Sequence, residues 1–381
     1  MNKIYLDHAA SSPMHPEAAA AMMSVMTGHF GNASSVHGFG REAKKIVNGS
    51  RDRIAALLGC DPDELIFTSG GTESDNLAIL GTLAADHARG KHIITSSVEH
   101  HAVLHTCHEL ERQGWEVTYL PVDNTGRLSV SDVEASIQDD TALITIMYGN
   151  NEVGTLQPIA EIGELARSRG IVMHTDAVQA LGMEEISCRE LPVNLWSFSA
   201  HKVNGPQGIG ALVHRRGTSL APRQHGGLQE KKRRAGTENM AGIAGFAKAL
   251  ELAVPSLSER RGHAEELRST LLTGLRAEIG EEAFIINGSE EHYMPHILNI
   301  SFPGIPTETM LMNLDMAGIA AASGSACTSG SLEISHVLLA MNLPENVYRS
   351  AIRFSFGLGN TTQEMEYTSQ KIGTFLKRLR K

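Results

Sequence analysis

The chain has 381 residues, of which 41% are hydrophobic and 20% charged, and its formal net charge is −10. This length allows a large core and two domains, and the composition is that of a globular protein. The negative charge argues against nucleic acid as a bulk partner, and no apolar stretch approaches the roughly 18 residues of a membrane span.

The N-terminus, MNKIYLDHAA, lacks the apolar region of a secretory signal. The four cysteines, Cys60, Cys107, Cys188 and Cys327, are scattered and form no C-x-x-C pair. This usage is typical of a reduced, intracellular protein. We therefore expect a cytoplasmic location.

The first elements predicted are helices at residues 16–26 and 41–58. The second is amphipathic and ends at Gly59. Between them, residues 31–40, GNASSVHGFG, are polar and glycine-rich, and we expect an ordered loop there.

From residue 65 onward, strand and helix patterns alternate. Strands are predicted at residues 65–68, 93–96, 116–120, 142–148, 171–175, 195–199 and 209–214. Helices are predicted at residues 102–113, 131–137, 159–169 and 242–252. This alternation predicts an α/β domain with a mostly parallel sheet covered by helices on both faces.

The pattern changes at residues 255–259, where a long charged helix begins and extends to about residue 279. Strands at 284–286, 297–302 and 352–356 and a helix at 307–316 then predict a smaller α+β domain. The predicted boundaries are 14–255 for the large domain and 1–13 with 256–381 for the small domain.

Lys202 ends the apolar, strand-like run of the segment WSFSAHKVNG. Burial there lowers the pKa of an amine, because the charged form is disfavoured. A neutral amine can form a Schiff base with an aldehyde, as pyridoxal phosphate (PLP) enzymes require. A turn lysine with a solvated head is the alternative.

Gly70, Gly71 and Thr72 lie between a predicted strand and a helix. Glycines let the backbone approach a phosphate, and the helix N-terminus presents free N–H groups. The Walker lysine is missing, so this is no nucleotide P-loop. The alternatives are an anion site and an ordinary turn.

His100 also lies where a strand meets a helix, and its ring could stack on a planar cofactor and move protons. A metal site is the competing interpretation, since other potential ligands follow closely: His101, His105, Cys107 and His108. Neither H-E-x-x-H nor zinc spacing is present, so no metal is expected.

Asp176 and Gln179 follow a predicted buried strand. An acid at the carboxyl end of a strand lies where α/β sheets bind ligands, and it can keep a pyridine nitrogen protonated. Gln179 could donate to the phenolic oxygen of the ring. A helix N-cap is the alternative role for the aspartate.

Arg353 lies inside an apolar strand and therefore needs a partner. A substrate carboxylate would suit it, because a guanidinium binds carboxylates bidentately; an internal salt bridge is the alternative. Cys327 lies among small residues that cannot pack a core, so we expect an accessible thiol.

The order and number of the motifs make the chain resemble the cysteine desulfurases, which are fold-type-I PLP enzymes related to the class-V aminotransferases. The matching segments are GNASSVHGFGREAKK, SGGTESDN, EHHAV, YGNNEVG, HTDAVQ, SFSAHKVNGPQG, RRAGTEN, SGSACTSGSLE and IRFSFG. The SGSACTS segment resembles the subgroup with a longer, mobile cysteine loop, at about residues 320–332. Two segments depart from the usual pattern, GGLQE with Leu228 and Ala10-Ser11-Ser12.

The resemblance implies a seven-stranded sheet, PLP as cofactor and a homodimer. It assigns the Schiff base to Lys202, ring stacking to His100 and the ring nitrogen and phenolic oxygen to Asp176 and Gln179. The phosphate is assigned to Gly71, Thr72, Ser199 and His201, with Thr237 from a partner subunit. The substrate is assigned to Asn32, Asn151 and Arg353, and the transferred sulfur to Cys327.

The activity implied is conversion of L-cysteine to L-alanine, with the sulfur held on Cys327 as a persulfide. The persulfide sulfur would then pass to an iron–sulfur scaffold or a tRNA-thiolating enzyme. The protein itself is expected to make no direct contact with nucleic acid or a membrane. The alternatives are a selenocysteine lyase or another β-eliminating PLP enzyme, and a sulfur carrier or scaffold without catalysis.

Overall fold

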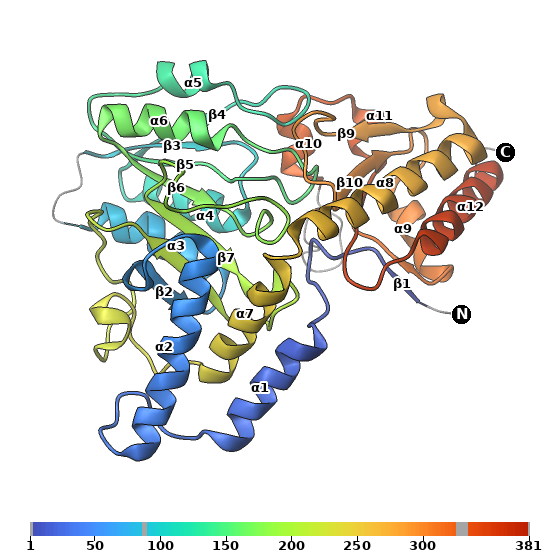
Figure 1. Ribbon diagram of the computed structural model, residues 1–381. Helices are drawn as coiled ribbons and strands as arrows, with labels where there is room; N and C mark the ends of the chain where they lie inside the picture. The colour runs from blue at the N-terminus through green and yellow to red at the C-terminus, as the bar shows by residue number, and fades with distance from the viewer. Residues whose placement is uncertain (1–2, 86–89, 325–333, 380–381) are drawn as a thin grey trace.

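The computed structural model describes residues 3–85, 90–324 and 334–379 (Figure 1). Its largest feature is a seven-stranded sheet in the order β2-β8-β7-β6-β5-β3-β4. The strands are β2 (Leu65–Thr68), β3 (His92–Ser96), β4 (Glu116–Leu120), β5 (Thr141–Thr145), β6 (Val172–Asp176), β7 (Leu195–Ser199) and β8 (Gly210–His214). β8 is antiparallel to both its neighbours and the other pairs are parallel, which confirms the prediction of a mostly parallel sheet.

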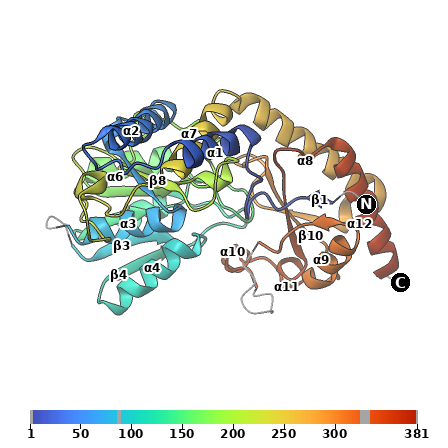
Figure 2. The ribbon, with the colours of Figure 1, turned by 90° about the horizontal axis from the view of Figure 1, so that it is seen from below.

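Helices cover both faces of this sheet (Figure 2). On one face lie α2 (Gly38–Leu58), α6 (Ile159–Arg169) and α7 (Met240–Ala253), which share one hydrophobic core. On the other lie α3 (Gly71–Leu83) and α4 (His101–Arg112). Because both faces are covered, every residue of β3, β5 and β7 is buried, and these strands need no alternation of polar and apolar residues.

The remaining helices of this part are α1 (Pro16–Gly28), which packs on α7, and α5 (Val130–Ala135), which packs on α6. α2 begins at Gly38, inside the loop predicted for residues 31–40. His37 explains the early start, because its Nδ1 accepts a hydrogen bond from the Gly40 N–H (3.2 Å) and caps the helix.

The C-terminal part has a three-stranded antiparallel sheet in the order β12-β10-β9. Its strands are β9 (Ile285–Asn287), β10 (Ile297–Ser301) and β12 (Ala351–Ser355), and its longer helices are α8 (Leu257–Ile279), α9 (Thr307–Met316) and α12 (Thr362–Leu379). These elements enclose a second core, to which Ile4 and Leu6 from the N-terminus also contribute. The predicted α+β arrangement is therefore observed.

The remaining elements are short. β1 (Ile4–Tyr5) pairs in parallel with β11 (Ile319–Ala320). The short helices are α10 (His336–Ala340), α11 (Glu345–Tyr348) and the 3-10 turns η1 (Pro62–Glu64), η2 (Ala200–Lys202), η3 (Gln229–Lys232) and η4 (Glu281–Ala283). Within the described residues, no single helix combines the length and apolar character needed to cross a membrane.

Candidate active site

A cavity of about 560 Å³ lies between the two sheets, at the carboxyl ends of β6 and β7. The first part contributes Asp176 and Lys202 to its lining, and the second contributes Arg353 and Gly324. The carboxyl edge of parallel strands is where open α/β sheets bind ligands. The volume is in the range of small-molecule sites.

Lys202 lies in the 3-10 turn η2, which directly follows β7. Its Nζ donates hydrogen bonds to the carbonyl oxygens of Ala9 and Ala10, the latter at 3.0 Å. Burial and then the charge of Arg353 lower the pKa of Lys202 to about 8, against the opposing effect of nearby acids. The side chain therefore supplies a neutral amine far more readily than a solvated lysine does.

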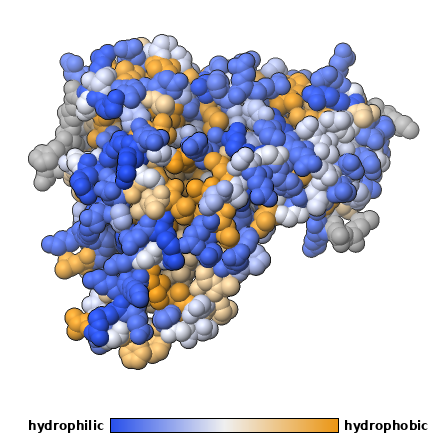
Figure 3. All heavy atoms as spheres, viewed as in Figure 1, coloured by the Kyte–Doolittle hydropathy of each residue, from blue (hydrophilic) through white to orange (hydrophobic). Residues whose placement is uncertain are grey.

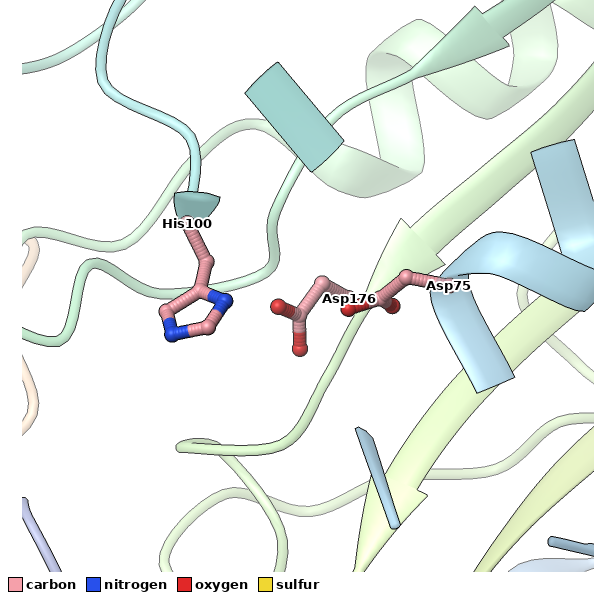
Figure 4. A group of neighbouring side chains, drawn as sticks. All are labelled: Asp75, His100 and Asp176. Carbon is pink, nitrogen blue, oxygen red and sulfur yellow. The ribbon is translucent and has the colours of Figure 1, made fainter. Parts of the chain in front are cut away.

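Asp176, His100 and Asp75 converge in the wall of this cavity (Figure 4). Their polar atoms lie within 4.8 Å of one another, although they come from the end of β6, the start of α4 and the interior of α3. Asp176 and His100 were predicted to lie in one site, whereas Asp75 was not. The two predicted residues face each other across a short gap.

Asp176 is buried, and its Oδ1 accepts a hydrogen bond from the Val178 N–H (2.9 Å). Burial raises the pKa of this carboxyl, whereas the hydrogen bond from the Val178 N–H and the charge of Lys202 lower it and favour the ionised form. An ionised carboxylate at this depth can pair with a cationic ring nitrogen. A turn, and not a helix, follows at residues 178–180, so the helix N-cap considered as the alternative role of Asp176 is not observed.

His100 caps α4, because its Nδ1 accepts a hydrogen bond from the Ala102 N–H (3.1 Å). The ring lies open to the cavity. Desolvation by the cavity walls, followed by the charge of Lys202, lowers the pKa of His100 to about 4. At neutral pH the imidazole is uncharged, so it can stack on a planar ring or accept a proton.

The start of α3 and the end of β7 form the predicted anion-binding corner. Gly71, Thr72, Ser199 and His201 all line the cavity. A Cβ on Gly71 would lie only 2.7 Å from Val178 Cγ2, so the close packing here requires glycine. The buried Nδ1 of His201 has no hydrogen-bond partner among the described residues. Free helix N–H groups, hydroxyls and an unpaired imidazole nitrogen suit a phosphate.

Arg353 is buried and lines the opposite wall. Its Nη2 pairs with Asp7 Oδ1 (2.9 Å), and its Nη1 donates to the carbonyl oxygen of Asn151 (2.9 Å). The internal salt bridge considered from sequence is thus present. Asn151 also lines the cavity, as predicted for a substrate contact.

Gln179 lies deep in the cavity, and its Nε2 donates to the carbonyl oxygen of Ala9 (2.8 Å), the same oxygen that accepts from Lys202. Two further predicted site residues, Asn32 and Thr237, do not line the cavity of their own subunit. Asn32 is exposed, with its Oδ1 accepting from the Ser34 N–H (2.8 Å), and Thr237 is exposed after η3. Their roles stay predictions.

Cys327 lies outside the described residues, but its neighbours Ser323 and Gly324 line the cavity. The three described cysteines are all buried. Burial raises the pKa of Cys60 and Cys107 to about 12 and that of Cys188 well above its ordinary value. These thiols are structural and unreactive.

The potential metal ligands predicted on α4 are divided between a buried and an exposed face of this helix. Cys107 packs in the hydrophobic core between α3 and α4, whereas His105 and His108 are exposed on the other face of the same helix. His101 lines the cavity and stacks on His105 with ring centroids 4.9 Å apart. The thiol therefore cannot join the imidazoles around one ion.

Sequence reasoning missed three buried acids beside the site, Asp75, Glu99 and Glu152. Burial raises the pKa of Glu99 to about 8, and Glu152 accepts a hydrogen bond from Ser335 (2.5 Å). Asp75 stands one turn beyond Gly71 in the SGGTESDN segment. An acid at that spacing from the anion-binding glycines was the signal that could have identified it.

Comparison with known proteins identifies the family of the chain. The model of the family "Aminotransferase class-V" matches residues 4–368. The chain belongs to this family. A Bacillus subtilis protein is 50% identical over 380 residues and covers 100% of both chains. The cysteine desulfurase IscS of Dictyoglomus turgidum is 45% identical, over 99% of this chain and 95% of its own.

Solved structures of this family share the fold of the chain. A NifS-like protein superposes with a TM-score of 0.92 at 36% identity, covering 99% of this chain and 100% of its own. The structure of "SspA in complex with cysteine" gives a TM-score of 0.82 at 35% identity, over 93% and 99% of the two chains.

Proposed function

We propose that the protein is a cysteine desulfurase that converts L-cysteine to L-alanine and receives the sulfur on Cys327. The Cβ–S bond of the substrate breaks, the sulfur joins the Cys327 sulfur as a persulfide, and the carbon product takes up protons. The observation that supports this most directly is the convergence of Lys202, Asp176, His100 and Arg353 in one cavity. The similarity to named cysteine desulfurases over the full chain also supports it.

The donor set fits pyridoxal phosphate as the cofactor. Lys202 offers an amine with a lowered pKa, and Asp176 offers a buried carboxylate. The unpartnered Nδ1 of His201 and the start of α3 would hold the phosphate, with Ser199 and Thr72. When bound, PLP supplies an electron sink that acidifies the carbon atoms of an amino acid.

The chain itself then has three tasks. Lys202 and the neutral His100 accept and return the Cα proton of the substrate, since both bases face the same cavity. Asp176 holds the cofactor ring in its cationic form, and Gln179 orients the phenolic oxygen. Arg353 and Asn151 bind the substrate carboxylate.

The function is tested by incubating PLP-loaded protein with L-cysteine and measuring alanine and sulfide in the presence of a reducing thiol. Equal amounts of the two products are expected. Pyruvate and ammonia in place of alanine would instead indicate β-elimination.

Replacement of Arg353 by alanine is expected to raise the KM for L-cysteine about thirtyfold, with kcat changed much less. The loss of a charge-assisted contact to a carboxylate costs about 2 kcal/mol, which corresponds to that factor. Steady-state kinetics at saturating PLP give both constants.

Asp7→Asn is the matched control, because it breaks the same ion pair from the other side. If Arg353 only stabilises the fold through Asp7, both variants should lower the melting temperature alike and leave KM unchanged. A KM increase confined to the arginine variant supports the substrate role.

A homodimer is supported by an exposed apolar surface at one end of the molecule. Figure 3 shows hydrophobic residues over the lower end of α1 and α2. Met26, Phe30, Val36 and Phe39 are exposed by 57% to 89% of their surface, and the two phenylalanine rings lie 5.1 Å apart. Apolar surface concentrated in this way is typical of a subunit interface, and a second copy of the chain would cover it.

The segment leading to Thr237 is held to α2 and β2 through Glu230. Glu230 is buried and accepts hydrogen bonds from Arg51 (2.6 and 3.0 Å) and from the Phe67 N–H (3.1 Å). Glu230, Lys231 and Lys232 have φ angles of 46°, 57° and 68°, an unfavourable conformation that this anchor maintains. We propose that the exposed Thr237 reaches the phosphate site of the partner subunit.

Thr237→Ala is expected to weaken PLP retention about tenfold to a hundredfold, as for the loss of one hydrogen bond to a charged group, without dissociating the dimer. Dialysis against buffer, followed by absorbance of the retained cofactor, measures this. Thr218→Ala, also outside the cavity, serves as control. A monomer in solution that retains PLP fully would contradict the shared site.

We also propose a cytoplasmic enzyme divided into a large domain, 14–255, and a small domain of 1–13 and 256–381. The sulfur would pass from Cys327 to an acceptor protein, either an iron–sulfur scaffold or a tRNA-thiolating enzyme. The segment that carries Cys327 begins at the rim of the cavity, at Gly324, which supports transfer from the site to an outside thiol.

A further inference from the structure

Asp75 is the buried acid closest to the proposed ring-binding carboxylate (Figure 4). It lies in the second turn of α3 and is only 1% exposed. Its Oδ1 accepts no hydrogen bond from the described residues, and the nearest basic group is His174 Nε2 at 3.6 Å. The Ser197 hydroxyl is a hydrogen-bond partner of this carboxyl and favours its charged form, but one neutral donor compensates little for a buried anion.

The groups around this pair offer little compensating charge. His174 is held between Thr145 (2.8 Å) and Ser197 (2.9 Å), and its burial lowers its pKa to about 3, so it is neutral. His100 is neutral as well, and Glu99 is a third buried acid. Lys202 is the one cationic group among these neighbours, and it lies toward Asp176. Two adjacent carboxylates sharing a single cation cannot both ionise readily.

We propose that Asp75 is a positioning residue that keeps the proton of this carboxyl pair and donates it in a hydrogen bond to Asp176. The donated hydrogen bond stabilises Asp176 as the anion that faces the ring nitrogen of the cofactor. The pair of carboxyls holds one proton throughout, and that proton lies on Asp75 and not on Asp176. This inference rests on the proposed PLP site.

The titration of the two acids agrees with this arrangement. Burial, and then the negative charge of Asp176, raise the pKa of Asp75 well above its ordinary value. Burial raises the pKa of Asp176 as well, but the hydrogen bond from the Val178 N–H and then the charge of Lys202 oppose that rise. As the pH rises, Asp176 therefore loses its proton first and Asp75 keeps its own.

Two variants of Asp75 separate its hydrogen bond from its shape. Asp75→Asn keeps the size and an N–H donor but carries no charge, whereas Asp75→Leu removes the donor. The PLP dissociation constant is measured for each by fluorescence titration of cofactor-depleted protein from pH 5.5 to 8.5. The titration of PLP itself is the same for every variant, so differences report on the protein.

For the wild type, PLP affinity should fall as the pH drops through the pKa of Asp176. Asp75→Asn should follow the wild type within about twofold. Asp75→Leu should weaken binding about tenfold at pH 7 and move the loss of affinity about one pH unit higher, because Asp176 loses a hydrogen bond to its charged form. Equal damage in both variants, or no shift of the pH profile in Asp75→Leu, would overturn the proposal.

A second measurement covers the case in which Asp75→Leu does not fold. The infrared difference between PLP-loaded wild type and Asp75→Asn at pH 7 should contain the C=O band of a protonated carboxylic acid. A carboxylate band there instead would show Asp75 ionised and refute the inference. If wild-type protein fails to bind PLP at all, the proposed function fails, a result distinct from a bound cofactor with an ionised Asp75.

Discussion

Lys202→Ala is expected to abolish the formation of alanine and sulfide from L-cysteine, with a loss of at least about 10³-fold. Lys202 lines the cavity from the 3-10 turn that directly follows the buried strand β7, and its amine has a pKa lowered to about 8. General acid–base catalysis alone contributes about 10²- to 10⁴-fold, and the covalent hold on the cofactor is lost as well. Single-turnover assays with excess PLP measure the remaining rate.

Two controls separate this chemical loss from a structural one. Lys371→Ala changes a lysine on α12 that lies over Tyr367, far from the cavity, and should leave the rate unchanged. Added methylamine should partly restore the Lys202→Ala rate, because a small free amine can occupy the vacated base position. Normal turnover by Lys202→Ala would refute the proposed role of this residue.

The main sheet was predictable because most of its strands are short, largely apolar runs, although the edge strand β4 is only partly buried. Each of the seven predicted strands lies within a few residues of an observed one, since helices bury both faces and the sequence records this directly. β1 and β11 were missed, because a two-residue strand has no periodicity and its partner lies more than 300 residues away. α12 was missed too, as its buried stripe, which includes Met365, Ile372 and Leu376, lies within a strongly polar segment.

The site was predictable to the extent that its residues follow strands. Lys202 and Asp176 directly end or follow neighbouring parallel strands, so the topology brings them to the same edge. The pairing of Arg353 with Asp7 could not be predicted from the sequence, because the two residues are 346 positions apart. Asp75 was also missed, since an acid inside a helix usually faces solvent, and only the packing of α3 on the sheet shows that this one is buried.

In the proposed reaction, Cys327 is the nucleophile that attacks the substrate sulfur. The three described cysteines are poor candidates for this role. Cys60, Cys107 and Cys188 are buried, with thiol pKa values far above neutrality. Cys327 follows Gly324, which lines the cavity, by three positions in the sequence.

Cys327→Ser is expected to bind PLP and L-cysteine like the wild type but to lose at least about 10³-fold in alanine formation. Lys202, His100 and Asp176 remain in place, so loss of the Cα proton should continue and can be followed by exchange of the Cα hydrogen in deuterated water. Cleavage of the C–S bond should stop, because a serine hydroxyl is a far weaker nucleophile toward sulfur than a thiolate. Cys107→Ser, which alters a core thiol, is the control and should cost stability rather than activity. If Cys327→Ser forms alanine at the wild-type rate, no protein thiol takes the sulfur, and direct release, as in a lyase, becomes the better account of this cavity.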